Sequence, residues 1–162
     1  MITRTLLGAA LVAIGLSLAK RSRESARSDV PYPDGYRRWT HVKSALSAPK
    51  SDADPRAGLH HVYANALALR GYETGRFPEG SVIVFDLLAV TTENGTPREA
   101  GRKLVDVMHK DSTRFAGTGG WGFEEFQGDT RTRVLSDRAR TACFQCHTQR
   151  KDRDFVFSRL RP

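Results

Sequence analysis

The sequence predicts an α+β domain in which a mainly antiparallel β-sheet is flanked by helices. Apolar and alternating stretches fill the middle of the chain, and only short turns separate them, which favours antiparallel pairing of consecutive strands. Segments with helical signals lie before and after these strands, and the last of them lies near the C-terminus. The chain has 162 residues, which suits one such domain with an N-terminal extension.

Each expected element has its own local signal. In chain order they are a short helix over 34–42, a loop over 47–58, a strand over 59–64, a helix over 66–74, strands over 81–90 and 103–109, one helical turn over 110–115, a strand over 121–127, a weaker strand over 130–135 and a helix from 136 or 137 to about 149. Tyr36, Trp39 and Val42 recur at helical spacing in the first helix. Asn65 can cap the second helix and Gly75 can end it.

The strands in the middle of the chain have the strongest signals. The stretch 81–90 is almost continuously apolar and is bounded by turn residues, so we expect a central strand that is covered on both faces. Asn94 and Gly95 favour a tight turn, which allows 103–109 to pair with that strand. The stretch 121–127 alternates as a strand does.

The last helix carries the most informative motif, Cys143-Phe144-Gln145-Cys146-His147. This C-x-x-C-H run is typical of haem attachment in c-type cytochromes. Two thiols one helical turn apart can each add to a vinyl group of the same haem, and the next residue can ligate the iron. Both cysteines of the chain lie in this run. We therefore expect one covalently bound haem c on a C-terminal helix, with Cys143 and Cys146 as attachment points and His147 as the iron ligand.

Three other uses of the motif are less consistent with it. A structural disulfide between Cys143 and Cys146 suits an exported protein. A zinc site needs four ligands, and the chain has no second pair of cysteines. A thioredoxin-like redox pair is expected early in a βαβ unit and not near the C-terminus. None of these uses requires His147.

The N-terminus is typical of an export signal. An apolar run ends at Ala19 and is too short for a comfortable membrane span. Positive charges follow from Lys20 and disfavour cleavage, so 1–19 is predicted to be either a signal peptide or an uncleaved anchor. The polar stretch 20–31 is predicted to be a flexible tether, and 32–162 the mono-haem domain. We expect a periplasmic protein, which agrees with covalent haem attachment.

The formal net charge is +8 at neutral pH. Such a charge suits a solvated surface, and it also attracts an acidic redox partner protein or an anionic membrane. The arginines are spread along the chain, and no nucleic-acid motif accompanies them. We therefore expect no nucleic-acid partner.

Several stretches resemble the cytochrome P-460 family, which includes the cytochromes c′-beta. They are Arg37-Arg38-Trp39, Val62-Tyr63-Ala64-Asn65, Phe77-Pro78-Glu79-Gly80-Ser81-Val82-Ile83-Val84, Lys110-Asp111, Arg114-Phe115, Gly120-Trp121-Gly122-Phe123, the haem motif and Phe155-Val156-Phe157-Ser158-Arg159. The resemblance covers roughly 32–161. The turn and strand that begin at Phe77 and the tail from Phe155 are more specific than the haem motif.

The resemblance implies a mostly antiparallel β domain with one haem, usually in a homodimer. The iron is expected to be five-coordinate, with His147 on the proximal side and an open distal side. Family members that oxidise hydroxylamine carry a lysine cross-linked to the haem, and the resemblance puts Phe85 at that position. The c′-beta members have an apolar distal pocket and bind nitric oxide and related small ligands. The phenylalanine therefore favours a gas-binding protein, although Phe85 is also an ordinary aromatic for a buried strand.

Other side chains are weaker candidates. Arg159 can pair with a haem propionate, or it is a surface arginine. Adjacent residues on a strand point to opposite faces, so one of His60 and His61 can line the distal pocket, although a surface role is favoured for both. Met108 or His109 can supply a sixth ligand, but the resemblance puts another strand opposite the iron. Glu124 and Glu125 are candidate proton acceptors, with a solvated strand face as the favoured alternative.

Three functions follow from these expectations. The first is a sensor, scavenger or buffer of nitric oxide. The second is an enzyme that oxidises hydroxylamine or reduces peroxide, against which the absence of a clear distal acid–base pair counts. The third is an electron carrier whose iron takes a sixth protein ligand.

Overall fold

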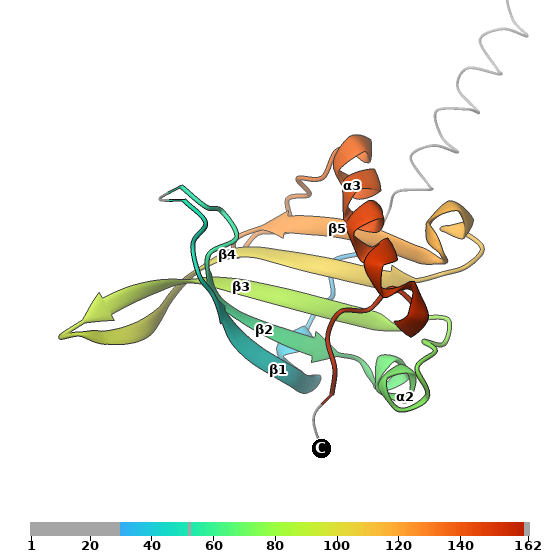
Figure 1. The fold of residues 1–162 in the computed structure, drawn as a ribbon, viewed down its shortest axis with the longest axis horizontal. Helices are drawn as coiled ribbons and strands as arrows, with labels where there is room; N and C mark the ends of the chain where they lie inside the picture. Colours follow the sequence, from blue (N-terminus) through green and yellow to red (C-terminus); the bar gives the residue numbers. More distant parts are fainter. Residues whose placement is uncertain (1–29, 52, 161–162) are drawn as a thin grey trace, which may run out of the picture.

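A computed structural model of the protein describes residues 30–51 and 53–160 (Figure 1). Within these residues, five strands form one antiparallel sheet in chain order. The strands are β1 (Thr40–Ser47), β2 (Gly58–Ala64), β3 (Val82–Glu93), β4 (Thr96–Lys110) and β5 (Trp121–Gln127). The helical elements are η1 (Tyr36–Arg38), α2 (Ala66–Thr74), η2 (Ala116–Thr118), α3 (Asp137–His147) and η3 (Thr148–Arg153). The predicted α+β class is confirmed.

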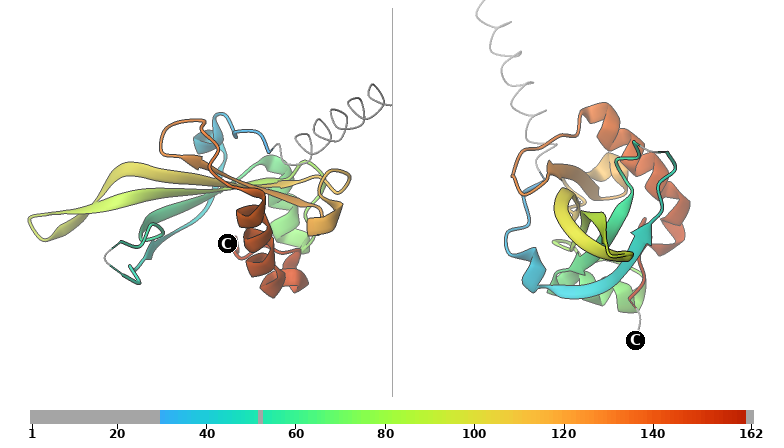
Figure 2. Two further views of the ribbon diagram at one scale, coloured as in Figure 1. Left: turned by 90° about the horizontal axis from the view of Figure 1, so that it is seen from above. Right: turned by 90° about the vertical axis from the view of Figure 1, so that its left-hand side faces the viewer.

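The sheet has a different cover on each face, as Figure 2 shows from above. Helices α2 and α3 and the C-terminal segment cover one face, and the segment before β1 covers the other. The buried cluster on the first face, the helix-side core, consists of Val42, Val62, Ala64, Ala68, Phe77, Ile83, Trp121, Phe123 and Val156. The cluster on the second face, the N-terminal core, consists of Val30, Tyr36, Val84, Val105, Val107, Phe115 and Phe126.

Strand β3 lies in the middle of the sheet, as its apolar run predicted. Alternate residues of this strand enter the two cores: Ile83 belongs to the helix-side core and Val84 to the N-terminal core. A strand that buries both faces needs apolar residues at consecutive positions, which explains the almost continuous run.

The helix predicted over 66–74 is confirmed with both of its ends. The Asn65 side chain accepts a hydrogen bond from the backbone N–H of Ala68 at 2.9 Å. Gly75 ends the helix in the left-handed region, with φ of 76°. The turn at Asn94 and Gly95 is also confirmed, since both residues have positive φ, as a tight hairpin turn requires. The two strands continue right up to this turn, so β3 and β4 form a longer hairpin than predicted.

The helix predicted over 34–42 is wrong except for the short turn η1. Tyr36 packs in the N-terminal core, whereas Val42 lies on β1 and packs in the helix-side core. The two residues have helical spacing in the sequence, but they pack on opposite faces of the sheet and not along one side of a helix. The single helical turn predicted over 110–115 is also displaced, because the short helix there is η2 at Ala116–Thr118.

The weaker strand predicted over 130–135 is wrong. This stretch forms one isolated bridge, between Phe126 and Arg133, and most of its residues are exposed. A strand at a sheet edge needs an apolar face to bury, and Val134 is almost half exposed.

The predicted signal or anchor over 1–19 and most of the predicted tether lie outside the described residues. Val30, the first described residue, falls within the predicted tether yet is buried in the N-terminal core. Val30 is therefore part of the packed domain and not of a flexible tether. No helix among the described residues has the length and apolar character needed to cross a membrane.

Candidate haem-binding cavity

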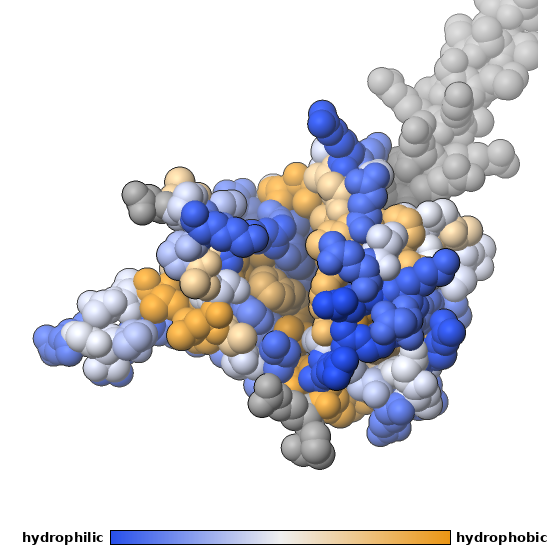
Figure 3. Space-filling model, in the orientation of Figure 1, coloured by the Kyte–Doolittle hydropathy of each residue, from blue (hydrophilic) through white to orange (hydrophobic). Residues whose placement is uncertain are grey.

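A cavity of about 460 Å³ lies between α3 and the helix-side face of the sheet. Cys143, Cys146 and His147 line one wall, together with residues of the C-terminal segment. Figure 3 shows apolar side chains in the hollow between α3 and the β1–β2 loop. The volume falls within the range of small-molecule and cofactor sites.

Helix α3 carries the motif in its last turns, and both of its ends are well defined. The Ser136 hydroxyl accepts a hydrogen bond from the backbone N–H of Ala139 at 3.2 Å and so caps the N-terminus. The helix ends at His147, so the two cysteines lie one turn apart in its last turns. Both thiols are free, and burial raises the pKa of the Cys143 thiol. Cys146 is exposed.

The imidazole of His147 is held by its neighbours. Its Nδ1 lies 2.7 Å from the backbone carbonyl oxygen of Phe155. A carbonyl only accepts hydrogen bonds, so Nδ1 carries the proton and Nε2 keeps a free lone pair. The rings of Phe123 and Phe157 both contact the imidazole, each with its centroid 5.0 Å from that of His147. Burial lowers the pKa of His147, which favours the neutral ring that a metal ligand needs.

The sheet supplies the other wall of the cavity. Phe85 is half-buried on β3, and its ring stacks on that of His60 with centroids 4.6 Å apart and planes 25° apart. Both residues line the cavity, as does Met108 on β4. Met108 pairs with Ile83 of β3, and paired residues of neighbouring strands share a face of the sheet, so both strands contribute to this wall.

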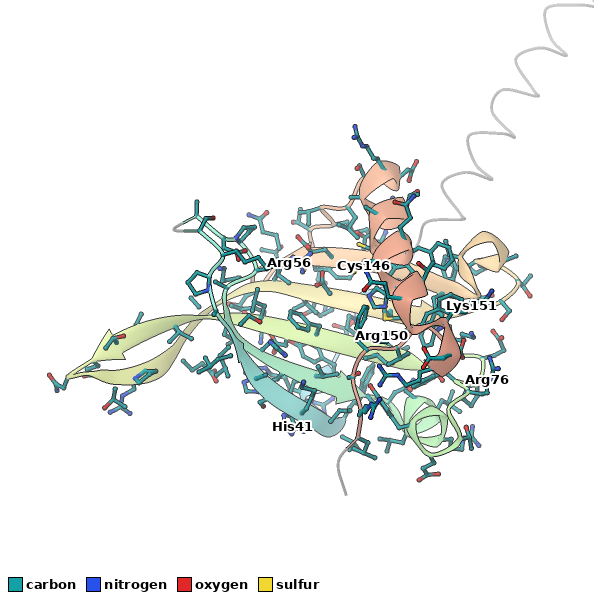
Figure 4. The ribbon with its side chains drawn as sticks, in the orientation of Figure 1. His41, Arg56, Arg76, Cys146, Arg150 and Lys151 are labelled. Atoms are coloured by element: carbon teal, nitrogen blue, oxygen red, sulfur yellow. The ribbon has the colours of Figure 1, made fainter. Side chains whose placement is uncertain are left out.

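A charged group also lines the cavity. Arg56 on the β1–β2 loop forms ion pairs with Asp106 on β4 and, at 2.7 Å, with Glu125 on β5. Burial raises the pKa of Asp106 to about 7, the nearby Glu125 adds to this rise, and Arg56 opposes it. Figure 4 shows Arg56 and Cys146 on either side of the hollow.

The Arg56–Asp106 pair is a feature that the sequence analysis missed. Its partners are 50 residues apart in the chain. The only sequence signal was the position of Asp106 between Leu104 and Met108, since alternate residues of a strand share a face. A carboxylate at such a position is unusual unless a partner compensates its charge.

The remaining candidates lie in different places. Arg159 is exposed and lines a second cavity of about 230 Å³ beside α2, apart from the motif. His61 forms a hydrogen bond with Ser44, with 2.7 Å between Nδ1 and Oγ. Glu124 lines the haem cavity, but it is buried and pairs with Arg140 of α3 at 2.7 Å, so the expected solvated face is wrong for this residue.

The donor set of the cavity fits a haem. Two free thiols and a histidine with a free nitrogen lie beside aromatic and aliphatic walls, as an apolar macrocycle requires. Lys43 also lines the cavity and forms no ion pair with another described residue, so it is available to a carboxylate such as a propionate. Among the described residues, no group of three His, Cys, Asp or Glu side chains is arranged to hold a bare metal ion.

Residues 33–158 match the model of the family described as Cytochrome P460. No curated protein matches the chain.

Proposed function

Because the chain belongs to the cytochrome P460 family, it is a haem protein, and we propose that it binds small gaseous ligands such as nitric oxide at a covalently attached haem. The proposal assigns thioether bonds to Cys143 and Cys146 and the proximal position to His147. A bound haem supplies an iron whose vacant position takes a diatomic ligand. The c′-beta type within the family agrees best with this reading.

The observation that carries the proposal is the apolar wall at Phe85. Its ring lines the cavity and stacks on His60, and no amine stands at this position. The hydrocarbon ring of Phe85 itself gives no hydrogen bond to bound dioxygen, whose bound form is polar. Nitric oxide binds ferrous iron strongly without such a bond, so an apolar distal wall favours nitric oxide over dioxygen.

A haem propionate bound in the cavity needs a cationic side chain as a partner. Arg159 is the propionate partner that the sequence suggested, but it lines a different cavity. Lys43 lines the haem cavity and has no partner among the described residues, so it is the better candidate for a propionate. Arg56 is less available, because two carboxylates already hold its guanidinium.

The test is a set of optical spectra of the haem-loaded protein, followed by titration with nitric oxide. We expect a five-coordinate iron in both oxidation states and stoichiometric uptake of nitric oxide by the ferrous form. Replacing Phe85 by Leu, which keeps the wall apolar, should preserve this uptake. Replacing it by Gln should raise dioxygen affinity about tenfold, as one added hydrogen bond of about 1.4 kcal/mol allows.

Three results would overturn the proposal. Colourless protein with free or disulfide-bonded cysteine sulfurs would show that no haem is covalently bound. A strongly red-shifted ferrous band would indicate a lysine cross-link. A six-coordinate, low-spin iron that does not take up nitric oxide would indicate an electron carrier, for which Met108 and His60 on the cavity wall are available ligands.

A second candidate function is oxidation of hydroxylamine or reduction of peroxide. The Arg56–Asp106–Glu125 group favours it, because a carboxyl with a pKa near neutrality is suited to accept or donate a proton. Replacing Asp106 by Asn should then lower turnover about a hundredfold or more, within the range for general acid–base catalysis. The matched control is Asp129→Asn, at an exposed carboxylate outside the cavity. Equal activity of the two variants would exclude this role.

The expected location outside the cytoplasm is also part of the proposal. It rests on the export signal predicted over 1–19 and on the thioether bonds. Fractionation of cells that express the full chain should recover the coloured protein in the periplasm or at the membrane that faces it. Recovery of coloured protein in the cytoplasm alone would contradict this location.

A further inference from the structure

We propose that the buried ion pair between Lys110 and Asp154 positions the proximal side of the site by holding the Phe155 carbonyl against His147. This inference rests on the proposed function, in which His147 ligates the iron. Neither residue lines the haem cavity. Both act at a distance, through the turn that follows η3.

The turn has an unfavourable backbone. Asp154 has φ of 49° and Phe155 has φ of 67°, so two consecutive residues other than glycine lie in the left-handed region. Such a conformation is uncommon for single residues with side chains, and more so for an aromatic one. It persists only where the surrounding structure compensates its cost, which is often at a functional site.

The compensation comes from Asp154, whose acceptors are all used. One carboxylate oxygen accepts from Lys110 Nζ at 2.8 Å, and the other accepts from the backbone N–H of Phe77 at 2.9 Å. Its backbone carbonyl accepts from Trp121 Nε1 at 2.9 Å. These bonds tie the turn to three separate parts of the fold: the end of β4, the turn after α2 and the start of β5.

Lys110 is as firmly held as its partner. Only 7% of this residue is exposed, and its ammonium also donates to the carbonyl of Gly119 at 3.0 Å. The ammonium lies 5.0 Å from the ring centroid of Trp121, a cation–π contact. A lysine at this depth needs such partners, because burial of an uncompensated charge is costly.

Aromatic packing completes the support of the turn. The Phe155 ring lies so close to Gly119 that a Cβ there would collide with it. It also contacts the Phe144 ring of α3, with centroids 5.5 Å apart. The position of the Phe155 carbonyl is therefore set by the bonds of the adjacent Asp154 and by the packing of the Phe155 ring.

The position of the Phe155 carbonyl affects the imidazole of His147. The hydrogen bond from His147 Nδ1 to this carbonyl sets the orientation of the ring and raises the basicity of Nε2. Loss of either member of the ion pair should let the turn relax to ordinary backbone angles and carry the carbonyl away. The iron–histidine bond should then weaken, and the reduction potential should rise, because a less basic ligand stabilises the ferric state less.

The experiment uses two variants of the haem-loaded protein. Lys110→Met removes the charge and keeps an unbranched chain, and Asp154→Asn removes the charge in a residue type that tolerates the left-handed region. The readouts are the iron–histidine stretching frequency of the ferrous protein and the midpoint potential. We expect the frequency to fall and the potential to rise in both variants, without loss of the thioether bonds.

The matched control is Arg102→Met. Arg102 pairs with Asp86, which is fully buried, but Asp86 belongs to the face of the sheet opposite the cavity. This variant should lose stability to a similar degree and leave both readouts unchanged. If Lys110→Met and Asp154→Asn lower the melting temperature and leave the frequency and potential at their original values, the pair is structural only and the inference is wrong.

The outcomes also separate this inference from the function it rests on. Absence of an iron–histidine band in the unmodified protein would overturn both. A band that is present and does not respond to either variant would overturn the positioning role alone. If neither charge variant retains haem, Gly119→Ala, whose Cβ pushes on the Phe155 ring and strains the left-handed backbone at Gly119, supplies the same two readouts, and unchanged values would again contradict the positioning role.

Discussion

Asp106 is a single residue whose chemistry depends on its surroundings. As a carboxylate on an exposed strand face it would be charged at neutral pH. In the cavity wall, burial favours its neutral form, and Glu125 adds to the effect. Arg56 limits the rise in the pKa without cancelling it. The residue thus combines a structural cost with a proton that can be exchanged near neutral pH.

The first prediction concerns the pH dependence that this residue causes. The folded-state pKa of Asp106 is raised from 3.8 to about 7, so the folded protein binds more protons than the unfolded chain between these values. Its contribution to stability is therefore complete below pH 3.8 and is lost as the pH rises through about 7. Relative to the original protein, Asp106→Asn should become steadily more stable over this range. Urea unfolding at several pH values measures the difference, and a difference independent of pH would contradict the assignment.

At the scale of the elements, helix α3 is held to the sheet by a buried carboxylate. Glu124 on β5 is fully buried and accepts hydrogen bonds from Arg140 and from the backbone N–H of Leu135. The helix carries no fully buried residue of its own. Its attachment therefore depends on this charged contact, on Phe144 and Cys143 packing against the helix-side core, and on whatever fills the cavity.

The second prediction tests this attachment. Among the described residues, Arg140→Met leaves buried Glu124 with the more distant Arg133, at 3.9 Å, as its one charged partner. It should destabilise the protein by about 3 kcal/mol, at the lower end of the range for breaking a buried pair. Arg138→Met, at an exposed arginine on the same helix, should change the stability by less than about 0.5 kcal/mol. Denaturant unfolding compares the two, and equal effects would show that the Glu124 contact does not anchor the helix.

Helix α2 shows the same dependence on neighbours. Gly71 lies in its interior, where glycine is normally unfavourable. A Cβ at this position would collide with the ring of Phe77, which belongs to the helix-side core. The close approach of the helix to this ring explains the glycine.

The third prediction follows from that contact. Gly71→Ala should destabilise the protein by about 1 to 3 kcal/mol through overpacking, although alanine is the better helix former. Gly101→Ala should be neutral or stabilising by about 0.5 kcal/mol, because nothing lies within 4 Å of the added methyl group. Thermal unfolding should give a lower melting temperature for Gly71→Ala and an unchanged or higher one for Gly101→Ala, and a stabilising Gly71→Ala would rule out the collision.

At the scale of the whole molecule, the sheet separates two cores that differ in completeness. The N-terminal core is formed by the protein alone, from the sheet and the segment before β1. The helix-side core borders the cavity of about 460 Å³, so its packing is complete only when a cofactor fills that space.

The fourth prediction concerns removal of the cofactor. A Cys143→Ser, Cys146→Ser double variant produced without haem should keep the N-terminal core and lose order on the other face. Hydrogen exchange should become about tenfold faster or more in α3 and in the turn at Phe155. The amides of Val84 and Val105 in the centre of the sheet should stay protected. Uniform loss of protection over both faces would mean that the helix-side core is not less stable than the N-terminal core when haem is absent.

Predictions from local signals were the most accurate. The helix at Ala66–Thr74 is confirmed because Asn65 and Gly75 each lie next to one end of the helix and bond to its nearby backbone. The helix expected over 34–42 was wrong because spacing alone does not tell which face of a sheet a residue will bury. The same contrast holds for the residues of the cavity. The motif on α3, a local pattern, was predicted, whereas the contact between Arg56 and Asp106, which are distant in the chain, was not.

The sequence by itself determined the haem motif, the order of the strands and the apolar side chain at Phe85, because these are properties of neighbouring residues and of residue type. The tertiary structure alone decided that His60 and Phe85 stack, that Asp106 meets Arg56, and that the Phe155 carbonyl reaches His147. The first two contacts join segments that are distant in the chain, and the third depends on the turn after η3, which is held by residues of other elements. Their energies depend on strand register and burial, and neither quantity exists until the whole sheet has formed.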